Sequence, residues 1–438
     1  MSARKSSPTN TQDVTARETS DAAPPGLFEF LAKLGRALTA SGVSVITVGS
    51  ILREIATAYG VSSEIMSFPN MLLIKLGQDE IAPITATTVN RELMTIKLSQ
   101  ISEVYEVAHQ AQRAAISPEE GIQRLAQIFS ERPRFGPVGM FVGYLLFALG
   151  LGMLLQLTPQ ELLLSEVFGG LVAILIIFSQ NKPQFSLILP VVAAALVSAL
   201  FTFGARQGLT VGSLIVVLPA LAWFLPGATL TTGMFELASG SIISGASRTI
   251  YGIAVLFLLL FGVLIGVQLG GLPSEGFMIS RPLNALGWWA PYVGALVFGV
   301  GLFLFMSIRQ KDIPWVLLTL YIALIGQQVG GFLIGGYFGA FFGSLLMTIS
   351  GTLIGRSPHR TPEFVAILPA FWILVPGSLA FISLVTLVGQ NYLTAIANIV
   401  LVVMTLIAIS LGLLVGATII EPFKGITAKL GIDRSILR

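Results

Sequence analysis

The chain has 438 residues, of which 54% are apolar and 11% are charged, and its formal net charge is +3. Soluble domains usually carry about 25% charged residues, so most of this chain must lie where charge is costly. The lack of cysteine excludes disulfides and thiolate metal sites, and two histidines leave little material for a zinc site or a His-based catalytic triad. We therefore expect no enzyme activity, no cofactor and no metal.

The charged residues are concentrated at the N-terminus. Residues 1–135 hold 27 of the 47 charges, which predicts a soluble domain up to about Arg134 and a membrane domain after it. The basic residues of the membrane part flank apolar segments, a pattern typical of membrane topology and not of nucleic-acid binding. The expected divisions are a disordered tail over 1–25, a cytoplasmic domain over 26–135, two membrane repeats over 136–270 and 285–420, and a cytoplasmic tail over 421–438.

The first 25 residues are rich in Ser, Thr, Ala and Pro and have no apolar core, unlike a signal peptide. The following residues predict a small mixed α/β domain that packs on the membrane part or regulates it. Its expected elements are a helical segment over 27–60 interrupted near Ser41 and Gly42, one or two strands over 65–76 bending at Pro69 and Asn70, and helices over 104–115 and 118–129, the last capped by Ser117.

Apolar segments long enough to span a membrane dominate from Gly136 onward. The ten predicted spans are 137–156, 162–179, 185–204, 209–226, 248–269, 288–307, 313–330, 334–354, 364–387 and 393–418. With the N-terminus in the cytoplasm, ten basic residues flank the spans on the inside and only Arg206 and Arg281 lie outside. The pattern predicts a multi-pass protein of the cell (inner or plasma) membrane with both termini in the cytoplasm.

An internal repeat recurs at a spacing of 150 residues. Residues 218–227 read LPALAWFLPG and residues 368–377 read LPAFWILVPG, with five identical positions. Gly262 and Gly266 have counterparts at the same offset, Gly412 and Gly416. Each copy contains five predicted spans, and an odd number means that the second copy enters the membrane from the opposite side. The fold class predicted is therefore a polytopic α-helical membrane protein built from two inverted five-helix repeats.

Both copies contain a Pro-Gly pair, Pro226-Gly227 and Pro376-Gly377. Proline removes a backbone donor and glycine permits unusual dihedral angles, so each pair is expected to break the fourth or the ninth span. A break in lipid must line a cavity or a protein interface, because its freed backbone groups need partners. Matched breaks in two halves indicate a substrate site; two kinks that only shape helix packing are the other interpretation.

Residues 228–248 after the first break are unusually polar, and the second copy replaces them with mostly apolar residues. Glu236 is the strongest candidate for carrying a proton, because a carboxylate in a membrane helix is costly and tends to be functional. A solvated position at the cytoplasmic interface is the alternative for Glu236. Arg248 could bind a substrate carboxylate or pair with Glu236. Glu166 is a second carboxylate inside a span, either a proton carrier or a residue that reaches the outer face.

The motif P-x6-P-G-x2-L-x2-G-x2-E-L-x2-G-x4-G-x2-R runs from Pro219 to Arg248. On this motif and on residues 368–378, the chain resembles the threonine/serine exporter family, over roughly residues 30 to 420. The resemblance implies proton-driven export of small hydroxy amino acids. It implies L-threonine, L-serine, protons and the lipid bilayer as partners; a homo-oligomer is possible.

The leading hypothesis is thus a secondary transporter that exports L-threonine and L-serine. In it the substrate meets the two breaks, and Glu236 or Glu166 carries the coupled proton. The expected substrate-binding residues are Pro226, Gly227, Thr231, Thr232, Glu236, Ser239, Arg248, Pro376, Gly377 and Ser378. The alternatives are export of another small polar metabolite such as a dicarboxylate, a membrane-anchored enzyme or sensor with its activity in residues 26–135, and a passive channel.

Overall fold

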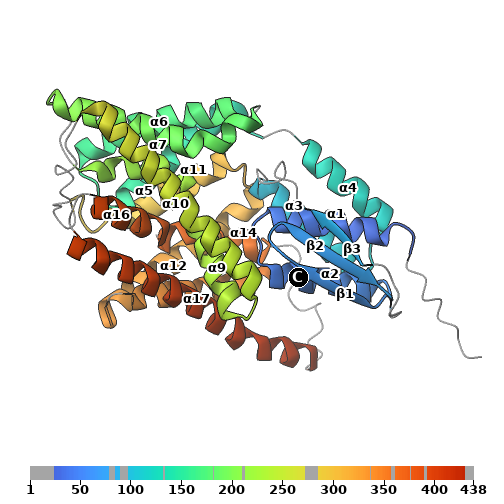
Figure 1. The fold of residues 1–438 in the computed structure, drawn as a ribbon. Coiled ribbons are helices and arrows are strands. Elements are labelled where there is room, and N and C mark those ends of the chain that lie inside the picture. The colour runs from blue at the N-terminus through green and yellow to red at the C-terminus, as the bar shows by residue number, and fades with distance from the viewer. Residues whose placement is uncertain are drawn as a thin grey trace, which may run out of the picture.

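The structure is a computed structural model that describes residues 24–77, 84–88, 97–131, 134–180, 182–209, 213–271, 285–335, 337–356, 361–374, 376–388 and 392–429. It has two parts, an N-terminal domain that contains a small sheet and a bundle of long helices beside it (Figure 1). The predicted tail over 1–25 lies outside the described residues except for its last two.

The N-terminal domain packs helices against a three-stranded antiparallel sheet of order β1-β2-β3. The interruption predicted near Ser41 and the strand bend near Pro69 are confirmed, and Ser117 Oγ accepts a hydrogen bond from Glu120 N at 3.1 Å, as a capping residue should. The elements are α1 (Leu27–Ala40), α2 (Val45–Ala58), β1 (Ser63–Ser67), β2 (Met71–Leu76), β3 (Thr85–Thr88), α3 (Leu98–Ala111) and α4 (Pro118–Ser130).

Helix α1 lies directly on the sheet. A Cβ at Gly35 would lie 2.5 Å from the Leu72 side chain of β2, so the glycine lets α1 lie close to the strand. Leu72 and Ile74 alternate inward along β2 and are buried. Strand β3 was not predicted, because its four residues are mostly exposed threonine and alanine with no apolar alternation.

The bundle contains eight helices that are long and apolar enough to cross a membrane, or nine if one bent pair counts as a span, within the described residues. The chain is therefore a multi-pass membrane protein. Its elements are α5 (Gly136–Leu154), α6 (Pro159–Ser179), α7 (Pro183–Arg206), η2 (Leu214–Val216), α8 (Val217–Leu221), η3 (Ala222–Phe224), α9 (Gly227–Ala238), α10 (Ile242–Gly270), α11 (Ala290–Phe305), η5 (Gln310–Asp312), α12 (Ile313–Leu333), α13 (Phe338–Gly355), α14 (Glu363–Ile367), α15 (Ala370–Leu374), α16 (Pro376–Val388) and α17 (Tyr392–Lys429).

Three boundaries differ from the predicted spans. The fourth span was expected to end at Pro226, but helix continues beyond the break to Ala238. The sixth predicted span corresponds to a helix of only 16 residues, α11. Helix α17 extends into the predicted C-terminal tail, up to Lys429. A count of exactly ten spans thus stays a prediction.

Glycines let two helix pairs approach backbone to backbone. A Cβ at Gly262 of α10 would lie 2.5 Å from the Val191 carbonyl oxygen of α7, and a Cβ at Gly412 of α17 would lie 2.5 Å from the Phe341 carbonyl oxygen of α13. Gly412 follows Gly262 by 150 positions, and Phe341 follows Val191 by the same number. The same relation holds one turn later, for Gly266 with Ala195 and Gly416 with Leu345.

Valine at either glycine should destabilise the bundle by a similar amount. Because the obstructing atom is a backbone oxygen, we expect Gly262→Val and Gly412→Val each to lower the free energy of unfolding by about 1–3 kcal/mol. Gly331→Val is the control, because a Cβ there meets nothing within 4 Å. Thermal unfolding in detergent measures the difference. If either variant unfolds at the same temperature as Gly331→Val, the close helix approach described at that glycine is wrong.

Candidate functional site

The first Pro-Gly pair separates two short helices. Residues 214–224 form one half and α9 the other, and their axes differ by 62°. Pro226 precedes the first residue of α9, a position where its missing N–H costs no helical hydrogen bond. In the second copy α15 ends at Leu374 and α16 begins at Pro376. The break predicted in the first copy is confirmed. In the second copy residue 375 lies outside the described residues and residues 363–383 form one candidate span, so that break stays a prediction.

The two Pro-Gly pairs touch each other. A Cβ at Gly377 would lie 3.1 Å from the Gly227 nitrogen, 3.2 Å from its Cα and 3.2 Å from the Leu225 Cβ. Residues far apart in sequence thus meet at their glycines, a contact we call the Pro-Gly crossing. Helix α9 begins there, and a helix N-terminus carries partial positive charge and free N–H groups. The buried Ser378 lies in the first turn of α16.

Aromatic side chains surround the segments that lead into the crossing. Trp223 and Trp372 stack with ring centroids 5.9 Å apart at 8°, and Phe305 packs edge-on against Trp223 at 4.8 Å. The buried Tyr144 hydroxyl donates to the Ala220 carbonyl oxygen at 2.7 Å. A side chain from α5 therefore satisfies a carbonyl of the irregular segment, as the membrane requires.

Sequence reasoning did not assign these aromatic residues a role. Trp223 and Trp372 stand three and four positions before the prolines of the two Pro-Gly pairs, which was an available signal. Nothing local to the sequence around Tyr144 marks it, because its partner is 76 positions away.

The predicted hydroxyl residues differ in their surroundings. Thr231 lies one turn into α9 and is fully buried, and its Oγ1 has no hydrogen-bond partner among the described residues. A buried polar atom without a partner needs an explanation, such as an ordered water or another bound molecule. Thr232 is half-buried. Ser239 donates to the Phe235 carbonyl oxygen of its own helix at 2.8 Å, so its hydroxyl is already engaged.

Glu236 and Arg248 form a second group, where the bundle meets the N-terminal domain. Glu236 is fully buried, and its Oε2 lies 3.2 Å from Arg248 Nε. The loop between α1 and α2 covers this pair. Val45 N donates to Glu236 Oε1 at 2.9 Å, and Arg248 donates to the Val43 carbonyl oxygen at 3.0 Å. At 1.5 Å per residue, Glu236 is about 13 Å along α9 from Gly227.

Glu166 lies on a different helix from the residues of the Pro-Gly crossing and from Glu236 and Arg248. It is partly buried on α6, which packs against α8, and its Oε1 has no hydrogen-bond partner in the described part of the chain. The structure therefore distributes the predicted site residues over three places. The described residues also include no group of three His, Asp or Glu side chains that could hold a metal ion.

Asp312 joins the two parts of the molecule at another point and was not predicted. It is fully buried and accepts hydrogen bonds from Arg309 Nε at 2.8 Å, Ser102 Oγ of α3 at 2.8 Å and Thr361 Oγ1 at 3.0 Å. Its signal in the sequence was an acidic residue directly before an apolar span. Arg309 also contacts Glu106 of α3 at 3.2 Å.

Asp312→Asn should weaken the attachment of the N-terminal domain. The substitution leaves the partly buried Arg309 without its main counter-charge, so we expect the free energy of unfolding to fall by about 3 kcal/mol. Glu106→Gln removes the more exposed partner of the same arginine and should cost less than about 1 kcal/mol. Thermal unfolding of both variants in detergent provides the comparison. Equal losses of unfolding free energy in the two variants would show that the buried contacts of Asp312 stabilise the protein no more than the exposed contact of Glu106.

The family follows from two matches along the chain. Residues 29–270 match the family described as "Putative threonine/serine exporter", and residues 291–419 match the one described as "Threonine/Serine exporter, ThrE". The chain belongs to the threonine/serine exporter family. The resemblance expected from the motif ending at Arg248 is thus confirmed, and both Pro-Gly pairs lie within the matched residues.

Curated relatives are fungal proteins, several of which are named as membrane proteins. A pheromone-regulated membrane protein 10 from Debaryomyces hansenii is 22% identical over 80% of this chain and 36% of its own length. The pheromone-regulated membrane protein 10 of Eremothecium gossypii is 23% identical over 80% of this chain and 48% of its own length. The protein C7D4.12c of Schizosaccharomyces pombe is 24% identical over 90% of this chain and 55% of its own length. The chain spans about a third to a half of these relatives. No solved structure matches.

Proposed function

We propose that this threonine/serine exporter family member is a secondary transporter that exports L-threonine and L-serine, driven by the proton gradient. The observation that carries the proposal is the contact between Gly227 and Gly377, where the broken helix of the first copy meets the second Pro-Gly pair inside the bundle. Discontinuous helices at the junction of two repeats form the substrate sites of many secondary transporters. The family match supports the substrate class.

We further propose that the bundle consists of two inverted repeats of five spans each. Supporting this, α7 packs on α10 as α13 packs on α17, and their glycine contacts correspond at an offset of 150 residues. An inverted repeat lets the two halves exchange conformations, so that the centre opens to one side and then to the other. On this topology the N-terminal domain and both termini are cytoplasmic.

The substrate is proposed to bind at the Pro-Gly crossing. Its carboxylate would face the N-termini of α9 and α16, where free N–H groups and helix dipoles favour an anion. Thr231, one turn into α9, and Ser378, in the first turn of α16, offer hydroxyls, and the Thr231 hydroxyl needs a partner. A small substrate that has a hydroxyl of its own suits such surroundings. The Trp223 and Trp372 rings limit the size of the substrate.

We propose that protonation of Glu236 is coupled to movement of the part of the bundle that contacts the N-terminal domain. As a carboxylate it pairs with Arg248 and accepts a hydrogen bond from Val45. A protonated Glu236 no longer neutralises Arg248, so the hold on the loop over 43–45 weakens. Glu166 is the second proposed proton carrier, because its buried oxygen has no partner among the described residues.

Transport by the purified protein tests the proposal. We expect proteoliposomes to move labelled L-threonine when a pH gradient is imposed, and unlabelled L-serine to compete. Competition by a dicarboxylate, with none by L-serine, would instead identify another substrate class. Downhill flux that ignores the pH gradient would indicate a passive channel.

A further inference from the structure

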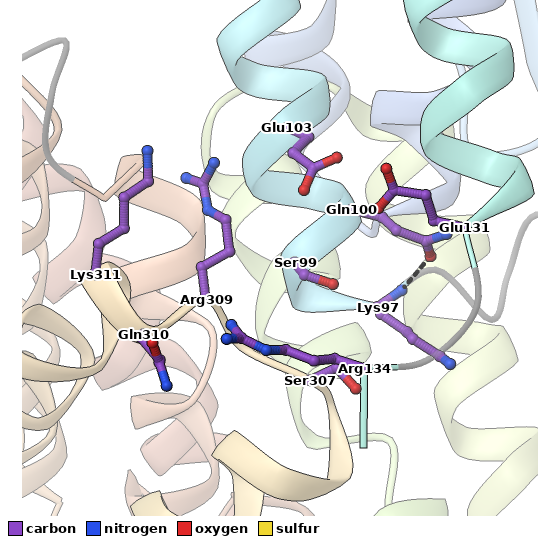
Figure 2. A pocket seen from close by; sticks show the side chains of 10 residues that line it. All are labelled: Lys97, Ser99, Gln100, Glu103, Glu131, Arg134, Ser307, Arg309, Gln310 and Lys311. Carbon is purple, nitrogen blue, oxygen red and sulfur yellow. Dashed lines mark hydrogen bonds between the residues drawn. The ribbon is translucent and has the colours of Figure 1, made fainter. Parts of the chain in front are cut away.

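A cavity of about 530 Å³ lies between the N-terminal domain and the bundle, separate from the Pro-Gly crossing (Figure 2). Binding sites for small molecules usually have volumes of about 300–1,000 Å³. Its walls come from the start of α3, the end of α4, the start of α5 and the segment before α12. The lining residues are Lys97, Ser99, Gln100, Glu103, Glu131, Arg134, Ser307, Arg309, Gln310 and Lys311.

Charges of opposite sign line different walls of this cavity. Figure 2 shows Glu103 and Glu131 above and Arg134 below, with the side chains of Arg134 and Lys97 pointing away from each other. No ion pair of 4.0 Å or less involves any of these four side chains within the residues that the structure describes. The other two cations, Arg309 and Lys311, are within 4.0 Å of Glu106 outside the cavity lining.

Two further features indicate a built site. Ser307 is only 2% exposed, its Oγ has no hydrogen-bond partner among the described residues, and its backbone is held at φ 51°. The positive φ belongs to the C-terminal cap of α11, where Ile308 N donates to the Phe303 carbonyl oxygen at 3.1 Å. Gln100 is fixed in the wall, since it accepts from Lys97 N at 3.0 Å and donates to the Ile128 carbonyl oxygen at 2.9 Å.

We propose that this cavity binds a small zwitterion, a free α-amino acid, with its carboxylate toward Arg134 and its ammonium toward Glu103 and Glu131. A simple anion would be repelled by the two carboxylates, and a simple cation would be repelled by Arg134. Burial, followed by the charge of Glu131, raises the pKa of Glu103 even though Arg309 and Lys311 act in the opposite direction, so the carboxylates gain from a nearby ammonium.

The bound amino acid would connect the two parts of the molecule. Glu103 and Glu131 belong to the N-terminal domain, Arg134 lies just before α5, and the facing wall with Ser307 and Arg309 belongs to the bundle. Occupancy therefore stabilises the docking of the domain whose loop over 43–45 holds Glu236 and Arg248. Regulation of transport through this docking rests on the proposed function; binding in the cavity does not.

Calorimetric titration of the full chain in lipid nanodiscs tests the inference. The probes are L-threonine, its methyl ester, which lacks the carboxylate, and N-acetyl-L-threonine, which lacks the ammonium. We expect Arg134→Gln and Glu131→Gln each to weaken one L-threonine binding event about tenfold or more, the equivalent of one hydrogen bond to a charged group. The controls are Arg113→Gln and Glu119→Gln, at exposed positions of the N-terminal domain. They should bind L-threonine with unchanged affinity.

Arg134→Lys should recover part of the affinity because it keeps the positive charge. The inference is overturned if Arg134→Gln and Glu131→Gln bind L-threonine like the controls, or if N-acetyl-L-threonine binds the cavity as tightly as L-threonine. Its failure is distinguishable from failure of the proposed function. Absence of threonine flux, with Arg134-dependent binding retained, refutes the transport proposal alone, and the reverse result refutes the cavity alone.

Discussion

Gly377→Val is expected to abolish threonine transport, reducing the rate by about a hundredfold or more. The Cβ of the valine would lie 3.1–3.2 Å from the backbone of Gly227 and from Leu225, and its two methyl groups would come closer still. The neighbours that must move include backbone of the other break, which cannot swing aside as a flexible side chain can. Displacing one helix N-terminus by about 1 Å is enough to spoil a positioned binding site.

Gly331→Val is the matched control, because it makes the same change in a bundle helix where a Cβ meets nothing within 4 Å. Initial rates of labelled L-threonine flux into proteoliposomes, normalised to the amount of folded protein, compare the two. We expect the control to transport like the unaltered protein. Full activity in folded Gly377→Val would mean that the Pro-Gly crossing is only a packing contact.

Glu236→Gln is expected to remove the pH dependence of transport. The substitution also removes the negative charge that compensates the largely buried Arg248, whose side chain is 10% exposed. Breaking a buried pair in this way costs about 3–5 kcal/mol, so the variant should be less stable as well. Thermal unfolding and threonine flux with and without a pH gradient measure the two effects separately.

A double substitution separates the structural role of Glu236 from its proposed role in coupling. In Glu236→Gln with Arg248→Met the unpaired charge is gone, so most of the lost stability should return. Coupling to the pH gradient should stay absent, because no carboxyl is left at this position. Flux that remains fully pH-driven in the single variant assigns the proton to another residue, with Glu166 the next candidate.

Much of the bundle could be predicted because its signals are local in the sequence. The apolar runs located the helices, and the predicted 150-residue offset recurs in the glycine contacts of α7 with α10 and of α13 with α17. The end of the fourth span at Pro226 was misplaced, because residues 227–238 contain Thr, Gly and Glu and were too polar to be counted in an apolar span. Those side chains are accommodated in α9, where Thr231, Gly233 and Glu236 are buried by neighbouring elements.

The composition of the candidate site was harder to predict because it depends on long-range contacts. The predicted substrate-binding residues between Pro226 and Arg248 were assigned to a single site, but the rise of α9 separates Gly227 from Glu236 by about 13 Å. The partners of Glu236 in the N-terminal domain lie 191 positions away. Asp312 likewise meets Ser102 over 210 positions. No periodicity or spacing in a single sequence identifies such pairs.

Protection of an introduced cysteine tests most directly whether substrate binds at the Pro-Gly crossing. The chain has no cysteine of its own, so Ser378→Cys provides a single reactive thiol in the first turn of α16. In proteoliposomes with active transport, we expect L-threonine to slow alkylation of this thiol several-fold, and to leave the exposed control Ser130→Cys unaffected. An alkylation rate at Ser378→Cys that is the same with and without saturating L-threonine would contradict a substrate site at the crossing.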